Sequence, residues 1–214
     1  MSYFPFFIDL DGRECLIAGG GNVAFRKART LLEFGAHIHM VAPDFSEDIV
    51  KLYEDNAESG RMSIDRRLFC EDDLEDVLFV IAATDNDVVN DRISIMCRNR
   101  NILVNVVDDK EKCGFYFPSI VKCGEIVVGV SSGGNSPVLA RNIRRNIEKT
   151  IPEYYEQMNE KLGNIREFVK ATVKEESDRK KCFETLVSKC DESGVVPDEE
   201  EMKKMVAEMF EEND

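Results

Sequence analysis

Three consecutive glycines, residues 19–21, separate a short apolar run from a segment with helical periodicity. The run Glu14–Ala18 has the length of a strand, and the apolar residues of 22–34 recur at the spacing of a helix. The sequence Gly19-x-Gly21-x-x-Ala24 therefore lies where a dinucleotide-binding turn requires it, directly after a strand and at the start of a helix.

This glycine turn predicts a site for a dinucleotide. Gly19 permits the tight turn, Gly21 lets the backbone approach a pyrophosphate, and Ala24 lets the helix pack closely on the strand. The first helical residues, Asn22 and Val23, offer backbone N–H groups and the positive end of the helix dipole to the phosphates. A glycine turn that binds no ligand is the alternative interpretation.

Residues at the ends of later strands complete the predicted cofactor site. Asp44, which follows Pro43, lies about 20 residues after the glycines, where an acid that binds the cofactor's ribose is expected. No arginine lies within residues 41–47 to receive a 2′-phosphate, so we expect NAD rather than NADP as cofactor. Thr84 and Asp85 end another strand, and we expect them either to line the same crevice or to cap the helix that follows.

Strand and helix patterns alternate over the first half of the chain. Strands are expected at 37–42, 62–68, 77–83 and 102–107, and helices run from Ser46, as cap, toward Gly60 and from about 87 to 99. Such alternation predicts an α/β fold with a Rossmann-type parallel sheet, whose ligands gather at the carboxyl ends of the strands.

The alternation ends after residue 113. Residues 115–130 are typical of a hairpin with its turn at 122–125, a helix follows at 138–149, and the chain is helical and polar from Pro152 onward. The apolar residues of the hairpin have no place in a parallel series, so we expect them to pair across a twofold homodimer. The predicted domains are a Rossmann domain at 1–113, a small α+β dimerisation region at 114–150 and a helical C-terminal domain at 151–214.

The charge distribution limits the partners. A net charge of −14 argues against nucleic acid as a main partner, because binding phosphate requires clustered basic residues. Ten acidic residues and two lysines lie within 191–214, and a solvated helix at 198–210 is the simplest interpretation of that block. No apolar run has the length of a membrane span and the first residues lack a basic leader, so we expect a cytoplasmic protein.

The cysteines and histidines predict no metal site. Seven cysteines occur without a C-x-x-C pair, which indicates neither a disulfide framework nor a zinc knuckle. His37 and His39, the only histidines, share one face of a strand, but two imidazoles alone are a weak metal signal.

Several segments together resemble the precorrin-2 dehydrogenase family, which includes the N-terminal module of siroheme synthases. In the family's order they are PFFIDLDGRECLIAGGGNVAFRKARTLLEFGA, IAATDNDVVN, NVVDDKEKCGFYFPSIV and VGVSSGGNSPVLAR. The resemblance implies a homodimer joined through the middle region, with a helical C-terminal domain. It also implies that NAD accepts a hydride as precorrin-2 becomes sirohydrochlorin, and that some members insert ferrous iron into that product.

The resemblance also implies a catalytic carboxylate. The family's catalytic aspartate lies in its Asn-Val-Val-Asp segment, which places it here at Asp108, just past the fifth strand. A carboxylate at that position can accept the proton that is released with the hydride. A turn residue is the alternative role for Asp108, and Asp109 beside it is expected to matter much less.

The substrate that the resemblance implies carries eight carboxylates, so an acidic protein would need a local basic patch to bind it. Arg141 and Arg144 lie close to one face of a predicted helix, with Arg145 and Lys149 nearby, and arginine forks pair well with carboxylates. A dimer interface or a solvated face would equally explain these residues. Ser132 corresponds to a serine that is phosphorylated in some relatives, and it is a candidate substrate contact or a turn residue.

The leading hypothesis is an NAD-dependent precorrin-2 dehydrogenase. A bifunctional enzyme that also inserts ferrous iron is the first alternative, because Asp108 can serve as proton acceptor in both steps. A non-catalytic NAD-binding regulator is the second, because a Rossmann domain alone fits many roles.

Overall fold

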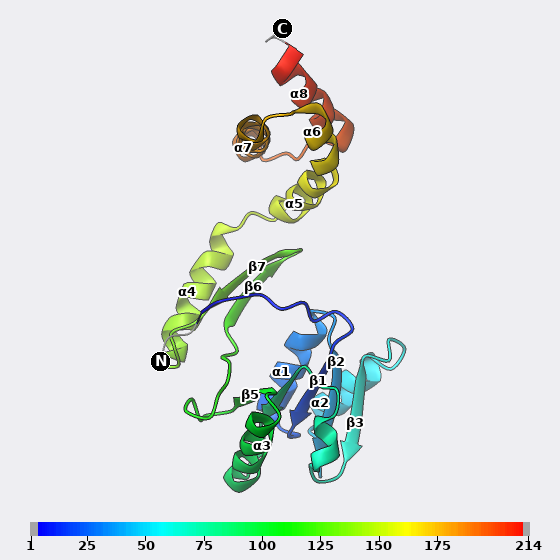
Figure 1. Cartoon of the computed structure of the whole chain (residues 1–214), viewed down its shortest axis with the longest axis vertical. Helices are drawn as coiled ribbons and strands as arrows, with labels where there is room; N and C mark the ends of the chain where they lie inside the picture. The colour runs from blue at the N-terminus through cyan, green and yellow to red at the C-terminus, as the bar shows by residue number, and fades with distance from the viewer. Residues whose placement is uncertain (1–3, 212–214) are drawn as a thin grey trace. The chain divides into compact units, whose positions relative to one another are not determined.

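A computed structural model describes residues 4–211 of the chain. The chain forms two compact units, Met1–Phe117 and Pro118–Asp214 (Figure 1).

Unit 1 is a parallel sheet with helical connections. Its strands β1 to β5 have the spatial order β3-β2-β1-β4-β5, in which the chain passes from β3 across to β4. The strands are β1 (Glu14–Ala18), β2 (His37–Ala42), β3 (Met62–Arg66), β4 (Phe79–Ala82) and β5 (Leu103–Val106), and the connections contain α1 (Asn22–Leu32), α2 (Glu47–Asp55), the 3-10 helix η1 (Glu71–Leu74) and α3 (Asp87–Asn99). The predicted Rossmann-type fold class is confirmed.

The sheet is buried on both faces because its strands are almost wholly apolar. Alternate residues of β1 point to opposite faces, as in any strand. Cys15 and Ile17 pack in one core with side chains of α1 and α2, whereas Leu16 and Ala18 pack in a second core with α3. The glycine turn at the end of β1 is therefore fixed to a strand that is fully buried.

Helices α1 and α2 of unit 1 end at Leu32 and Asp55, earlier than the sequence pattern indicated. Helix α2 stops at Asp55 and not near Gly60, because the Asn56 side chain donates a hydrogen bond to the Leu52 carbonyl and competes for the helical acceptor. Ser46 occupies the cap position of α2 as expected, yet its hydroxyl forms no hydrogen bond with any described residue.

Unit 2 begins with the hairpin of β6 (Ser119–Cys123) and β7 (Ile126–Val130), against which α4 (Pro137–Thr150) packs. The predicted turn at 122–125 was too long. Lys122 and Cys123 belong to β6 and pair with Val127 and Ile126, so the turn contains only residues 124–125, and Gly124 supplies its positive φ of 56°.

The rest of unit 2 is a helical bundle with its own core. It consists of α5 (Tyr154–Asn164), α6 (Arg166–Thr172), α7 (Glu176–Ser193) and α8 (Glu199–Glu211). Met202 and Val206 of α8 are fully buried, so the predicted acidic helix is solvated on one side only. Residues 212–214 of the acidic block lie outside the described residues. Within the described chain, no helix has the length and apolar character of a membrane span.

Candidate dinucleotide-binding and active site

The glycine turn is held by the ends of its neighbouring strands. The Gly19 N–H donates to the Val41 carbonyl of β2 at 3.0 Å, and the Ala83 N–H donates to the Ala18 carbonyl at 2.8 Å. Gly19 has a φ of 138°, and a Cβ there would lie 2.2 Å from the Ala83 carbonyl oxygen. Only glycine fits this position, as its predicted role in the tight turn requires.

Gly20 is equally constrained, although the motif assigned it no role. A Cβ on Gly20 would lie 1.9 Å from the Asp44 carbonyl oxygen, and the Gly20 carbonyl accepts a hydrogen bond from the Ser46 N–H at 2.9 Å. The turn that carries Asp44 thus touches the glycine turn through backbone atoms. The run of three glycines was the available signal for this contact.

Gly21 is exposed and differs from its two neighbours. A Cβ on Gly21 would meet no described atom within 4 Å, and its φ of −95° does not require glycine. Gly21 caps α1 without a side-chain hydrogen bond, so the N–H groups of Asn22 and Val23 open the helix beside free space. No acidic residue occupies the first turn of α1. Open space, free N–H groups and the absence of negative charge together fit the pyrophosphate of a dinucleotide.

Pro43 and Asp44 lie at the carboxyl end of β2 and are exposed, where the ribose-binding acid was predicted. A basic residue from outside residues 41–47 lies near this strand end. Arg66 ends β3 opposite Ala42, and its guanidinium lies 5.6 Å from the centre of the Phe45 ring. Arg66 is distant in sequence and adjacent only through the pairing of β2 with β3.

Thr84 is held by a buried asparagine of α3. The Thr84 hydroxyl donates to the Asn90 Oδ1 at 2.7 Å, and the Asn90 amide donates to the Thr84 carbonyl at 3.1 Å. Asn86, and neither Thr84 nor Asp85, caps α3 by accepting from two N–H groups of the first turn. Asp85 is exposed beside this cap. Asn90 was not predicted as a site residue, and its low exposure of 4% distinguishes it from a solvated helical asparagine.

Asp108 lies at the same edge of the sheet. The Val107 N–H donates to the Ala82 carbonyl at 3.0 Å, which fixes the end of β5 beside the end of β4. Asp108 follows with a left-handed φ of 62° and an exposed side chain. Two strand spacings separate β5 from β1, so Asp108 and the glycine turn are about 10 Å apart along the edge.

Asp109 has a different environment from Asp108. Its carboxylate accepts from the Lys112 ammonium at 2.8 Å and from the Glu111 N–H at 3.1 Å. The hydrogen bond from Lys112 holds the pKa of Asp109 below its usual range. The Asp109 carboxylate therefore stabilises its own loop.

Lys27 of α1 was not singled out by the sequence. Its ammonium lies 3.7 Å above the centre of the Phe117 ring, and burial lowers the pKa of Lys27 to about 8. This contact joins α1 to the end of unit 1.

The predicted substrate residues all belong to unit 2. The Ser132 hydroxyl accepts from the Ser136 N–H at 3.0 Å, and Ser136 in turn caps α4. Both Glu148 carboxylate oxygens accept from Arg144 at 2.9 Å, whereas Arg141 is exposed and forms no ion pair with a described residue. Arg141 is thus the arginine of this pair that is open to an acidic ligand.

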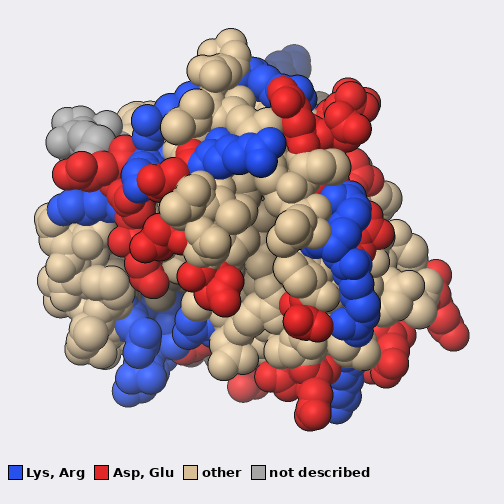
Figure 2. Space-filling model, turned by 90° about the horizontal axis from the view of Figure 1, so that it is seen from below, with Lys and Arg blue, Asp and Glu red and all other residues tan. Residues whose placement is uncertain are grey.

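Figure 2 shows the side of the molecule toward which β3 points in Figure 1, and which holds the carboxyl ends of the parallel strands. Basic and acidic side chains are interspersed there around a largely uncharged centre. The backbone N–H groups at the start of α1, and not a field of basic side chains, are therefore the feature of this side that fits an anion.

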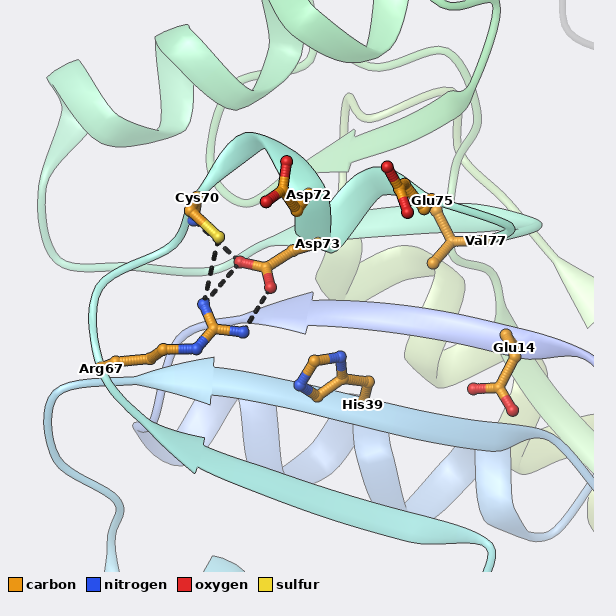
Figure 3. Close-up of a pocket in the computed structure, with 8 residues that line it drawn as sticks. All are labelled: Glu14, His39, Arg67, Cys70, Asp72, Asp73, Glu75 and Val77. Atoms are coloured by element: carbon orange, nitrogen blue, oxygen red, sulfur yellow. Dashed lines mark hydrogen bonds and ion pairs between the residues drawn. The ribbon is translucent and has the colours of Figure 1, made fainter.

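A cavity of about 550 Å³ lies elsewhere in unit 1 (Figure 3). Its lining includes Glu14, at the start of β1, whereas the glycine turn follows the end of that strand about 16 Å away. None of the predicted site residues lines it. Between β3 and β4 the chain contains only the short helix η1, whose residues Asp72 and Asp73 line the cavity.

An ion pair stabilises the wall of this cavity. The Arg67 guanidinium contacts both oxygens of the buried Asp73 carboxylate, and the Cys70 N–H donates to the same group at 2.8 Å (Figure 3). Burial opposes ionisation of Asp73, but the hydrogen bonds from Arg67 and Cys70 outweigh it and lower the pKa of Asp73.

The histidines near the cavity have separate partners. His37 pairs with Glu14 and His39 with Asp65, each at 3.2 Å. Among the described residues, no group of three or more metal-ligating side chains is arranged to hold an ion.

Sequence comparisons agree with the geometry of unit 1. The model of a family described as "Putative NAD(P)-binding" matches residues 6–119, more than half of the chain. The chain belongs to this NAD(P)-binding family. A second model, described as "Sirohaem biosynthesis protein central", matches residues 127–150, which include β7 and α4.

Several relatives are named siroheme synthase, and two of them show how much of the chain is shared. The protein from Nitrosospira multiformis is 38% identical over 187 residues, which are 87% of this chain and 40% of the relative. The protein from Pseudoalteromonas translucida is 36% identical over 211 residues, which are 96% of this chain and 44% of the relative. The chain thus spans less than half the length of these relatives.

A solved structure shares the fold of most of this chain. The structure of SirC, a precorrin-2 dehydrogenase, matches with a TM-score of 0.77 and covers 96% of this chain and 100% of its own. Its sequence identity of 24% makes this a likeness of fold.

Proposed function

We propose that the protein is an NAD-dependent dehydrogenase that converts precorrin-2 to sirohydrochlorin in siroheme biosynthesis. The proposal rests mainly on the carboxyl ends of the parallel strands. There the open glycine turn follows β1 and the exposed Asp108 follows β5 of the same sheet. The names of the relatives and of the solved structure, siroheme synthase and precorrin-2 dehydrogenase, support the choice of substrate.

The residues proposed to hold NAD are Gly19, Gly21, Asn22, Val23, Pro43, Asp44, Thr84 and Asp85. The N–H groups at the start of α1 would bind the pyrophosphate, and Asp44 would accept from a ribose hydroxyl. Asp44 and Asp108 lie on opposite sides of the glycine turn, after β2 and β5. An extended ligand bound at the turn can therefore reach both. When bound, NAD supplies the acceptor for the hydride.

The proposed catalytic residue is Asp108. Oxidation of precorrin-2 transfers a hydride to NAD and releases a proton, so a base at the crevice completes the balance. The Asp108 carboxylate is exposed at the end of β5 and is not drawn into the ion pairs of its neighbour Asp109. We assign Ser132, Arg141 and Arg144 to contacts with the substrate's carboxylates, with Arg141 the most accessible of the three.

A second activity, insertion of ferrous iron into sirohydrochlorin, has one supporting observation. The relatives are named for the synthesis of siroheme, the iron-containing product. Asp108 would again accept protons, with the iron as substrate. A non-catalytic NAD-binding regulator has less support, because nothing in a purely regulatory role requires an exposed carboxylate at the end of β5.

We further propose that the protein acts in the cytoplasm as a homodimer. Residues 114–150 would form the dimerisation region between a Rossmann domain at 1–113 and a helical domain at 151–214. All seven cysteines are free thiols, which agrees with a reducing compartment. Most apolar residues of β6 and β7 are only half-buried although α4 packs against them, and a second copy can cover them.

The test is the formation of NADH from NAD and precorrin-2 by the purified protein and its Asp108→Asn variant. We expect NADH absorbance from the wild type and about a hundredfold lower kcat from the variant, with unchanged affinity for NAD. Asp76→Asn is the matched control, because Asp76 also has a left-handed φ, 56°, but precedes β4 at the opposite end of the sheet. Equal activity of Asp108→Asn and wild type would contradict the assignment.

A further inference from the structure

The loop that carries Asp108 is fastened to helix α3 by a lysine. The Lys112 ammonium bridges two carboxylates, that of Asp109 in its own loop at 2.8 Å and that of Asp91 in α3. Two backbone carbonyls of the loop are bound from α3 as well. The Ser94 hydroxyl donates to the Lys112 carbonyl at 3.4 Å, and Arg98 donates to the Glu111 carbonyl at 3.2 Å.

The other end of the loop is fastened to β5. The Cys113 thiol accepts from the Val106 N–H at 3.3 Å and lies 3.2 Å from both the Val106 and the Asp109 carbonyl oxygens. The Gly114 N–H returns to the Val104 carbonyl at 2.8 Å. The chain thus leaves β5 at Val106 and comes back beside the same strand eight residues later.

Asp108 lies between these two attachments in a conformation that needs support. A left-handed backbone is uncommon for residues other than glycine and persists where surrounding contacts determine it. The charges of Asp108, Asp109 and Asp91 would also repel one another without a cation among them. Lys112 is the only cation that forms an ion pair with a residue of 107–113 in the described part of the chain.

We propose that Lys112 is the positioning residue for Asp108, holding its carboxylate over the end of β5 by tying the loop to α3 through Asp91 and Asp109. The inference rests on the proposed catalytic role of Asp108. Lys112 itself contacts neither cofactor nor substrate in this assignment, and its effect on the reaction passes through the geometry of the turn. Misplacing a reacting group by about 1 Å can cost a large factor in rate even when binding is retained.

The test compares Lys112→Met, Lys112→Arg and Lys110→Met in the full chain. Lys110→Met is the control, because Lys110 is an exposed lysine of the same loop that forms no ion pair with a described residue. In the free protein, hydrogen–deuterium exchange of residues 107–114 should become about tenfold faster in Lys112→Met only. With NAD and precorrin-2, kcat should fall about tenfold in the same variant, while the Kd for NAD is unchanged. Lys112→Arg should retain most of the rate, because a guanidinium can also bridge two carboxylates.

A double-mutant cycle separates positioning from general stability. If Lys112 acts through Asp108, adding Lys112→Met to Asp108→Asn should cause no further loss of kcat. A second tenfold loss in that background would overturn the positioning role. If hydrogen–deuterium exchange of residues 107–114 is unchanged in Lys112→Met, Lys112 does not hold the loop on α3, whatever the kinetics show. If the wild type forms no NADH but Lys112→Met exchanges faster, the proposed function is refuted. The proposed positioning of a catalytic Asp108 is then refuted as well, although Lys112 still holds the loop on α3.

Discussion

Gly21→Ala should separate cofactor binding from folding. Gly21 has a φ of −95°, and its missing Cβ would meet no described atom within 4 Å, so alanine fits the backbone. Alanine is a poorer helix cap than glycine, which costs about 0.5–1 kcal/mol. For a unit of this size the melting temperature should fall by about 4 °C at most. The added methyl group, however, stands in the space beside the first N–H groups of α1.

The expected effect on affinity is larger than the effect on stability. Displacing a phosphate from one or two charge-assisted hydrogen bonds costs about 2 kcal/mol, which corresponds to a roughly 30-fold increase in the Kd for NAD. Gly19→Ala should behave differently, because its Cβ would lie 2.2 Å from the Ala83 carbonyl oxygen. Backbone strain and the loss of a strand-end hydrogen bond should together cost about 3 kcal/mol.

Calorimetric titration with NAD and thermal melting followed by circular dichroism measure the two effects. Gly163→Ala in α5 is the control, because its Cβ also meets open space and it lies in unit 2. If Gly21→Ala binds NAD as tightly as the wild type, the glycine turn does not face the pyrophosphate. A fall in melting temperature equal to that of Gly19→Ala would show that the turn is more crowded at Gly21 than the structure indicates.

Three further predictions concern cofactor choice, acid stability and assembly. Steady-state kinetics should give a higher kcat/KM for NAD than for NADP. Arg66→Ala should lower the remaining kcat/KM for NADP, since Arg66 is the basic residue of β3 and lies opposite Ala42, near Asp44. A higher kcat/KM for NADP in the wild type would show that Arg66 has more effect on cofactor choice than Asp44. Because the pKa of Asp73 is lowered in the fold, its ion pair should stabilise the protein above about pH 4 and be lost as pH falls through the lowered pKa. Asp73→Asn should lower the free energy of unfolding by about 2 kcal/mol at pH 7. In urea titrations, the unfolding free energy of this variant should also fall less steeply with decreasing pH than that of the wild type. An unchanged pH dependence would rule out the Arg67–Asp73 pair as its source. Sedimentation should show a dimer at micromolar concentration. A fully active monomer would contradict the proposal that residues 114–150 form a dimer contact.

The strands and the glycine turn could be predicted because their signals are local. The apolar run before residue 19 and the helical spacing after residue 21 are contained in about 20 neighbouring residues, and β1 and β2 begin and end where the pattern placed them. The hairpin turn was predicted too long, since Lys122 and Cys123 are compatible with either a strand or a turn until their partners on β7 are known.

The residues that support the site could not be found in this way. Arg66 reaches the vicinity of Asp44 only through the pairing of β3 with β2, and Asn90 holds Thr84 only because α3 begins beside the end of β4. Gly20 is required by a contact with a carbonyl oxygen of another loop. Each role depends on the distance between segments that are far apart in sequence, which no local pattern contains.

The backbone contacts of the glycine turn have a consequence for the thermodynamics of binding. Gly19 and Gly20 are hydrogen-bonded to Val41 and Ser46, so contacts within the protein hold the shape of the turn. Fixing the backbone of a flexible residue costs about 1–2 kcal/mol of conformational entropy at room temperature, and a preorganised turn avoids this loss on binding. Any affinity of the turn for phosphate therefore depends on contacts that are made when the protein folds.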